Sequence, residues 1–422
     1  MVKEDFLQIL REELVPALGC TEPIALAFAA ARCREVLGFK AERIQAECSG
    51  NIIKNVKGVV VPNCGGMKGV DTAVAAGMLA GKSSLELEVL TAVKESDLPA
   101  IKEYLAGNAV EVSLLETEAK LHFIIVMEAE GHEALVEVKN EHTNIIRIEK
   151  DGEVLLDKRG SDDSDSESEL TDRSFMTVAN IIEFAETVDW HLLEPIIVPQ
   201  IENNIAICNE GLEHMWGSEV GRTVLEHGTA GSLSRAEALA AAGSDARMSG
   251  CSKPVVINSG SGNQGITVSI PVIEYARDRN IPKEQLVRAL AISNLLAIHQ
   301  KTHIGRLSAY CGAVCAACGA GAAITWLAGG NLAQVEETIT NTLATVSGMA
   351  CDGAKPSCAG KIAVAVNAAF IAHRMAMKNR CYSAGEGIVK DDIEDTIASV
   401  GEVAAKGMKD TDRVILDVML QK

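Results

Sequence analysis

The pattern of apolar residues changes character along this chain, and that change limits the folds available to it. The amino-terminal part alternates helical patterns with strand-like runs such as Val56–Val61 and Leu121–Glu128, and its later runs are typical of an antiparallel meander. The carboxy-terminal part has a nearly continuous helical pattern that is rich in Ala and Gly. Because small residues let helices approach closely, we expect a tightly packed helical core there.

An acidic, Ser-rich run at 160–169 separates the two patterns and cannot bury apolar surface. The chain has 422 residues, more than a single hydrophobic core usually serves. We therefore predict an α+β protein, with a mixed α/β domain at 1–158, a linker or exposed loop at 159–172 and an all-α, small-residue-rich domain at 173–422. Phosphorylation of the serines is an alternative use of the run, but its composition favours a solvated linker.

The charge balance excludes several classes of partner. The net charge is −19 and only 3% of the residues are aromatic, so the surface repels phosphate backbones and offers few rings for stacking on bases. The run Leu307–Val335 has no charged residue, but its Ala, Gly and Cys content favours a buried helix over a membrane span. The charged start Met1–Asp5 does not resemble a secretory signal, and twelve cysteines suit a reducing compartment. We expect a cytoplasmic protein that binds neither nucleic acid nor membrane.

Five cysteines in the carboxy-terminal part form a group with the character of a metal site. On one helix Cys311, Cys315 and Cys318 would share a face, and Cys351 and Cys358 flank a loop that contains Gly and Pro. Thiolates gathered in this way suit soft metals and iron–sulfur clusters. A structural zinc site lacks its usual paired CxxC spacing here, and any one of the helical thiols could simply fill the core. Spacing alone therefore favours metal binding without fixing the ligands.

A second motif is Gly19-Cys20-Thr21-Glu22-Pro23. Pro23 suits the first turn of a helix, which places Cys20 at a helix amino terminus. The dipole and the free N–H groups there favour thiolate over thiol, so we expect a lowered pKa and a role as nucleophile or base. The alternative is a small residue that closes a tight turn.

The stretch Ile257–Ile266 matches the pattern G-x-G-x-x-G. A dinucleotide site also needs a strand–loop–helix unit and a later acidic residue, whereas here Pro271 follows closely within a helical domain. We therefore expect no nicotinamide. A loop of backbone N–H groups with Ser and Asn side chains suits a small carboxylate better, and Ser49–Asn55 has similar character.

At these motifs the sequence resembles the L-cysteine desulfidase family, whose members are relatives of the iron–sulfur-dependent L-serine dehydratases. The resemblance runs nearly end to end. It rests on Gly19–Pro23, Ser49–Asn55, Gly260–Ile266, Gly305–Ser308 with Cys311-Gly312, and Met349–Lys355 with Ser357–Ala359.

The resemblance implies a [4Fe–4S] cluster held by Cys311, Cys351 and Cys358, which leaves Cys315 and Cys318 as core residues. It also implies an amino-terminal domain like the β part of the serine dehydratases and a helical domain like their α part. The active site would lie where the two domains meet.

The expected reaction is β-elimination on a small L-amino acid, without pyridoxal phosphate. L-Cysteine would give sulfide, ammonia and pyruvate, with Cys20 as the thiolate that removes the α-proton. L-Serine dehydration by the same route, a metal or redox sensor without turnover, and a nucleotide-dependent oxidoreductase are the alternatives. A homodimer is compatible with the sequence. The expected substrate contacts are Thr21, Glu22, Asn51, Lys54, Ser259, Ser261, Asn263 and Arg306.

Overall fold

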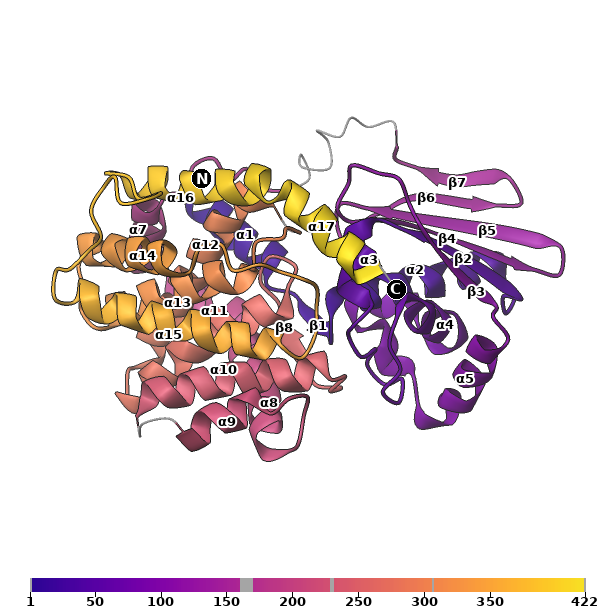
Figure 1. Ribbon diagram of the computed structural model, residues 1–422, viewed down its shortest axis with the longest axis horizontal. Coiled ribbons are helices and arrows are strands. Elements are labelled where there is room, and N and C mark those ends of the chain that lie inside the picture. The colour runs from indigo at the N-terminus through magenta and orange to yellow at the C-terminus, as the bar shows by residue number, and fades with distance from the viewer. Residues whose placement is uncertain (1, 160–169, 228–230, 306, 421–422) are drawn as a thin grey trace.

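The computed structural model describes residues 2–159, 170–227, 231–305 and 307–420. It confirms the α+β class, with a mixed α/β part and a helical part side by side (Figure 1). The acidic run at 160–169 and Arg306, one of the predicted substrate contacts, lie outside the described residues.

A six-stranded sheet forms one layer of the α/β part. Its order is β3-β2-β4-β5-β6-β7, in which β2 and β3 are parallel and every other neighbouring pair is antiparallel. The predicted meander is thus confirmed, and the alternating burial along β4 shows that one face of the sheet covers a core. The strands are β2 (Arg43–Cys48), β3 (Val110–Leu114), β4 (His122–Ala129), β5 (His132–Lys139), β6 (Ile145–Lys150) and β7 (Glu153–Asp157).

Helices pack closely against this sheet and against one another. A Cβ atom at Gly77 of α4 would lie 2.2 Å from the carbonyl oxygen of Ala27 on α2, so only glycine permits this approach. The predicted strand at Val56–Val61 is wrong, because Val56 ends α3 and a turn follows. The helices of this part are α2 (Thr21–Leu37), α3 (Gly50–Val56), α4 (Val70–Ala80) and α5 (Leu98–Ala106), with short 3₁₀ segments at Ser83–Ala92 and Glu95–Asp97.

The helical part packs around α13, most of which is buried, as expected for the uncharged run. A Cβ atom at Gly319 of α13 would lie 2.4 Å from the carbonyl oxygen of Ser293 on α12. No helix in the described part of the chain is both long and apolar enough to cross a membrane. The helices are α7 (Val178–Thr187), α8 (Glu194–Glu213), α9 (Val220–His227), α10 (Ser232–Met248), α11 (Gly262–Asp278), α12 (Lys283–Ile304), α13 (Gly312–Leu327), α14 (Leu332–Val346), α15 (Cys358–Ala376) and α16 (Ile393–Glu402), with a 3₁₀ turn at Trp190–Leu192 and a π-helical turn at Val403–Gly407.

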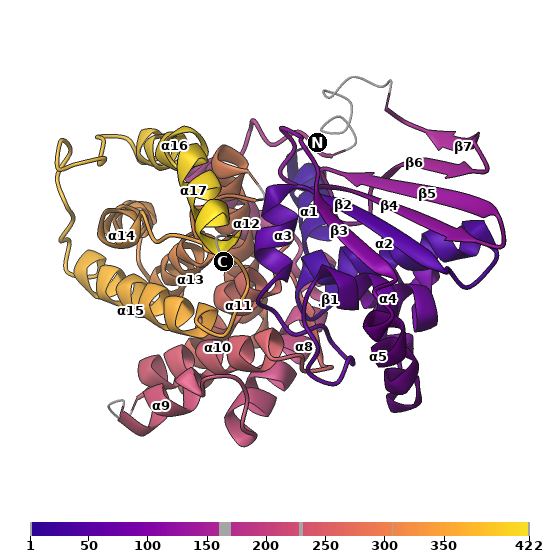
Figure 2. The same cartoon turned by 45° about the vertical axis from the view of Figure 1, so that its right-hand side comes forward.

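Among the described residues, segments near both ends of the chain connect the two parts. Helix α1 (Val2–Glu13) packs on α12, and its Phe6 ring lies 4.7 Å from that of Phe184 on α7. Strand β1 (Pro16–Leu18) pairs antiparallel with β8 (Pro254–Val256). Helix α17 (Lys409–Leu420) returns from the helical part to lie beside α3 (Figures 1 and 2). These crossings position the residues of the site described next.

Candidate functional site

The pairing of β1 with β8 brings the first motif of the sequence to the Gly-rich loop. Cys20 takes the N-cap position of α2, directly after β1. The next residue, Thr21, donates a hydrogen bond of 2.9 Å from Oγ1 to the carbonyl oxygen of Gly260. Gly19 has φ 61° and lies against Pro62, so the turn before the helix requires glycine. The two predicted motifs therefore meet at the junction between the two parts.

Cys20 and Glu22 form a buried acid–base pair. The Cys20 thiol donates to Glu22 Oε2 at 3.0 Å, and Asn55 Nδ2 donates to the other carboxylate oxygen, also at 3.0 Å. Burial and the charge of Glu22 raise the pKa of Cys20 well above its usual value. Burial alone would raise the pKa of Glu22, but the charge of His142 and the Cys20 hydrogen bond keep it below its usual value.

The expectation of a low pKa at Cys20 is therefore wrong, first because the thiol is buried and second because of a carboxylate within the motif itself. The amino terminus of a helix favours negative charge in its first turn. Glu22 occupies that turn and accepts the hydrogen bond from the thiol. The carboxylate thus takes the charge that the sequence argument gave to the sulfur.

The three cysteines predicted as ligands lie at the ends of neighbouring segments. An isolated antiparallel bridge joins Tyr310 to Ala350, which places Cys311 and Cys351 on adjacent extended stretches. Cys311 is the N-cap residue of α13, and Cys358 begins α15. Burial and the charges of Cys351 and Cys358 raise the pKa of Cys311 to about 12, so the three thiols act on one another electrostatically.

These thiols do not form a site for a single metal ion. Among the described residues, no three His, Cys, Asp or Glu side chains are grouped closely enough to hold one. Three mutually interacting thiols are nevertheless a donor set of the kind that binds iron–sulfur clusters, which are larger than one ion.

Cys358 also connects this group to Cys20. A small apolar cluster consists of Cys20, Val59 and Met248, with Ala354 and Cys358 packed against it. Cys20 and one of the predicted ligands thus contribute to the same cluster.

The loop at 351–358 is docked on α3. Gly353 has φ 94°, and a Cβ atom there would lie 2.4 Å from the carbonyl oxygen of Lys54. Lys54 Nζ donates to Asp412 Oδ1 of α17 at 2.5 Å and to the carbonyl oxygen of Cys351 at 3.5 Å. The charge of this predicted substrate contact is therefore neutralised by a carboxylate of the protein. Asn51 lies in the first turn of the same helix.

Two predicted contacts in the Gly-rich loop are used within the loop. Ser261 caps α11 by accepting from the backbone N–H of Gln264, and Ser259 Oγ donates to Asn258 Oδ1 at 2.9 Å. Asn263 Oδ1 accepts from Arg247 Nη1 at 3.1 Å. Because β8 belongs to a two-stranded antiparallel sheet, the loop does not form the parallel unit of a dinucleotide fold.

Several buried polar side chains at this junction were not predicted from the sequence. Arg247 Nε, Gln264 Oε1 and Asn55 Oδ1 are buried and have no hydrogen-bond partner among the described residues. Gln264 lies against Gly312, where a Cβ atom would be 2.5 Å from Gln264 Cδ, and hence beside Cys311. An Arg near the end of the Ala-rich α10 was the sequence signal for this position.

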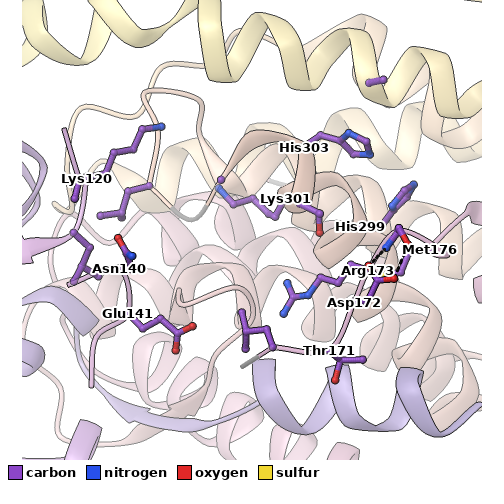
Figure 3. Close-up of a pocket in the computed structure, with 18 of the residues that line it drawn as sticks. Lys120, Asn140, Glu141, Thr171, Asp172, Arg173, Met176, His299, Lys301 and His303 are labelled. Atoms are coloured by element: carbon purple, nitrogen blue, oxygen red, sulfur yellow. Dashed lines mark hydrogen bonds between the residues drawn. The ribbon is translucent and has the colours of Figure 1, made fainter. Parts of the chain in front are cut away.

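A cavity of about 1330 Å³ lies between the two parts (Figure 3). Lys120, Glu141 and Arg173 line it, and Lys301 lies at its centre in that view. Burial lowers the pKa of Lys301, the nearby Cys315 and Cys351 oppose this, and the charge of Lys120 lowers the pKa further. Lys301 therefore lies within electrostatic reach of the cysteine group, although no cysteine is among the described residues that line the cavity.

Comparison with known proteins shows the family to which the sequence is related. A family model described as serine dehydratase alpha chain matches residues 84–417. Similar proteins include a UPF0597 protein of Treponema denticola, 50% identical over 423 residues (99% of this chain and 98% of the relative). Another UPF0597 protein, from Lachnoclostridium phytofermentans, is 51% identical over 414 residues (98% of this chain and 99% of the relative). A third, from Parabacteroides distasonis, is 39% identical over 429 residues (100% and 99%).

Proposed function

We propose, on the premise that the chain belongs to the serine dehydratase alpha chain family, that it is a carbon–sulfur lyase acting on a small L-amino acid. The substrate is L-cysteine and the products are sulfide, ammonia and pyruvate. The observation that carries the proposal is the buried Cys20–Glu22 pair, which packs through Cys20 against a cluster that includes Cys358. This packing supports an active site in which an acid–base pair lies beside cysteine thiols that suit a soft metal.

Cys20 and Glu22 supply the proton transfers. As the Cys20 sulfur accepts the proton from the substrate Cα, its own proton moves along the 3.0 Å hydrogen bond to Glu22, so the carboxylate is the base that drives the transfer. Both oxygens of Glu22 are engaged, one by Cys20 and the other by Asn55, so the sulfur is the atom available to the substrate. Elimination expels the β-sulfur as hydrosulfide, and the aminoacrylate tautomerises and hydrolyses to pyruvate and ammonia.

Cys311, Cys351 and Cys358 would hold a [4Fe–4S] cluster. When bound, that cluster supplies a Lewis acid that draws charge from the β-substituent of the substrate. The donor set fits because the three thiols interact with one another. The charge of Lys361 also stabilises the ionised form of Cys311 and Cys358, as thiolate ligation requires.

We favour L-cysteine over L-serine as substrate because a cluster held by thiolates would bind a soft sulfur atom better than the oxygen of a hydroxyl group. The alternative activity, L-serine dehydration, uses the same residues and would leave water in place of sulfide. A sensor without turnover would bind the same metal and release neither product.

Anaerobic reconstitution with iron and sulfide, followed by parallel assays of sulfide and pyruvate, tests the proposal. We expect L-cysteine to give both products. Cys351→Ala should lose colour and activity together, whereas Cys20→Ala should keep the colour and lose activity. The matched control is Cys33→Ala on the same helix, a buried thiol directed at sheet carbonyls, which should change neither. A coloured wild-type protein that turns over neither L-cysteine nor L-serine would overturn the proposal.

A further inference from the structure

Arg247 is a buried cation that forms no ion pair with a carboxylate of the described residues. Only 2% of the residue is exposed, and within the described ranges no Asp or Glu oxygen lies within 4 Å of its guanidinium. Other partly buried arginines of this chain are paired, as Arg173 is with Glu13. A buried charge is stable only when it is paired and hydrogen-bonded, so an unpaired guanidinium indicates a place prepared for an anion.

The guanidinium lies over the start of α11, beside the acid–base pair. Its Nη1 donates to Asn263 Oδ1 at 3.1 Å. A Cβ atom at Gly262 would lie 2.4 Å from Nε, so the second glycine of the Gly-rich loop makes room for this side chain. The charge of Arg247 is also felt by Cys20 and Glu22, which places it within electrostatic reach of both groups.

Acceptors without partners lie in the same region as this donor. Gln264 Oε1 and Asn55 Oδ1 are buried and accept no hydrogen bond from the described residues. Asn55 is bonded to Glu22, and Gln264 lies against Gly312, next to Cys311. Leaving such atoms unsatisfied costs free energy, so a ligand that donates hydrogen bonds is favoured there.

We infer that Arg247 binds the α-carboxylate of the substrate, while the amide oxygens of Gln264 and Asn55 accept hydrogen bonds from its α-ammonium group. This inference rests on the proposed function. A guanidinium can donate two parallel hydrogen bonds to a carboxylate, which a lysine ammonium cannot do. Lys54 is also already paired with Asp412. Arg247 is thus a determinant of specificity that selects α-amino acids over simple thiols and amines.

Two small thiols separate the carboxylate from the ammonium group. 3-Mercaptopropionate keeps the carboxylate and thiol of cysteine, and cysteamine keeps its amine and thiol. Binding of each is measured by titration calorimetry on the reconstituted protein. Arg247→Gln should weaken 3-mercaptopropionate by roughly thirty-fold, which is about 2 kcal/mol at 1.4 kcal/mol per tenfold, and change cysteamine by less than about three-fold. Gln264→Leu should show the opposite preference.

The matched control is Arg235→Gln on the same helix, because Glu274 keeps its second partner Arg277 when Arg235 is lost. It should alter neither probe. Because both probes are measured on the same variant, a general loss of structure would weaken both to the same extent. If Arg247→Gln does not fold, Arg247→Lys keeps the cation and should weaken binding of 3-mercaptopropionate alone, by about ten-fold. Equal losses for both probes, or none, would overturn the inference.

Turnover separates the inference from the proposed function. Wild-type protein that binds 3-mercaptopropionate through Arg247 yet turns over neither L-cysteine nor L-serine contradicts the function alone. Wild-type protein that turns over L-cysteine, with an unchanged KM in Arg247→Gln, contradicts the inference alone.

Discussion

Replacing Asp412 with Asn should release helix α17 from the α/β part. Lys54 and Asp412 form an ion pair of 2.5 Å in which only 2% and 13% of the two side chains are exposed. Asp412→Asn keeps the size of the side chain but leaves the Lys54 ammonium buried without its counter-charge. Removing one partner of a buried ion pair costs about 3–5 kcal/mol of stability. Because Asp412 is partly exposed, we expect Asp412→Asn to lose about 3 kcal/mol.

The loss should concentrate on the contact between α17 and α3. Besides this pair, the contact includes the Lys57 hydrogen bond to the carbonyl oxygen of Met419 and Leu416 packed over Gly50. At 1.4 kcal/mol per tenfold, about 3 kcal/mol raises the population of the detached helix by roughly a hundred-fold. Native-state hydrogen exchange of the α17 amides measures this population directly.

Glu118→Gln is the matched control, because it breaks an ion pair on the same helix that is largely exposed. Lys409 and Glu118 are 72% and 94% exposed, and such pairs contribute about 0–1 kcal/mol. Faster exchange along α17 in Asp412→Asn but not in Glu118→Gln is the expected result. Unchanged exchange in Asp412→Asn would refute the reasoning and return Lys54 to the role of substrate contact that the sequence predicted.

Three further predictions concern other parts of the chain. Burial raises the pKa of Asp245 to about 6. Between about pH 4 and 6 the folded protein therefore holds a proton that the unfolded chain has lost. Over this range the stability of wild type relative to Asp245→Asn should fall as pH rises, by at most about 3 kcal/mol, measured by urea denaturation. Gly77→Ala should cost about 1–3 kcal/mol in the same assay because its Cβ would meet Ala27, whereas Gly360→Ala, with open space around it, should cost nothing. Cys315→Ala should lose about 1 kcal/mol of stability and bind as much iron as wild type; loss of the iron would make this thiol a ligand.

Periodic patterns were sufficient to predict the architecture. The alternation in Leu121–Glu128 became β4, and the uncharged run after Leu307 became the buried helix α13, because period and burial are local properties of the chain. Val56–Val61 failed for the reason that short apolar runs often fail. The short apolar pattern is compatible with a strand, a helix end or a buried turn, and tertiary packing determines which of them forms.

The chemistry of the site depended on contacts that no local pattern contains. The ion pair between Lys54 and Asp412 joins residues 358 positions apart, so neither could be assigned its partner from sequence. The pKa of Cys20 rises because the thiol is buried and because the charge of Glu22 lies beside it, and burial is a tertiary property although both residues stood in the predicted motif. Arg247 stands out in the sequence only as an Arg near the end of α10, and its lack of a carboxylate partner among the described residues is a tertiary property that no local pattern contains.

The Mössbauer spectrum of the iron-reconstituted protein, recorded with and without L-cysteine, tests the central claim most directly. A [4Fe–4S] cluster held by the three thiolates of Cys311, Cys351 and Cys358 would have one iron without a protein ligand, so adding L-cysteine should change the signal of one iron site alone. A spectrum that L-cysteine leaves unchanged, or a cluster that persists when Cys351 is replaced by Ala, would contradict the claim.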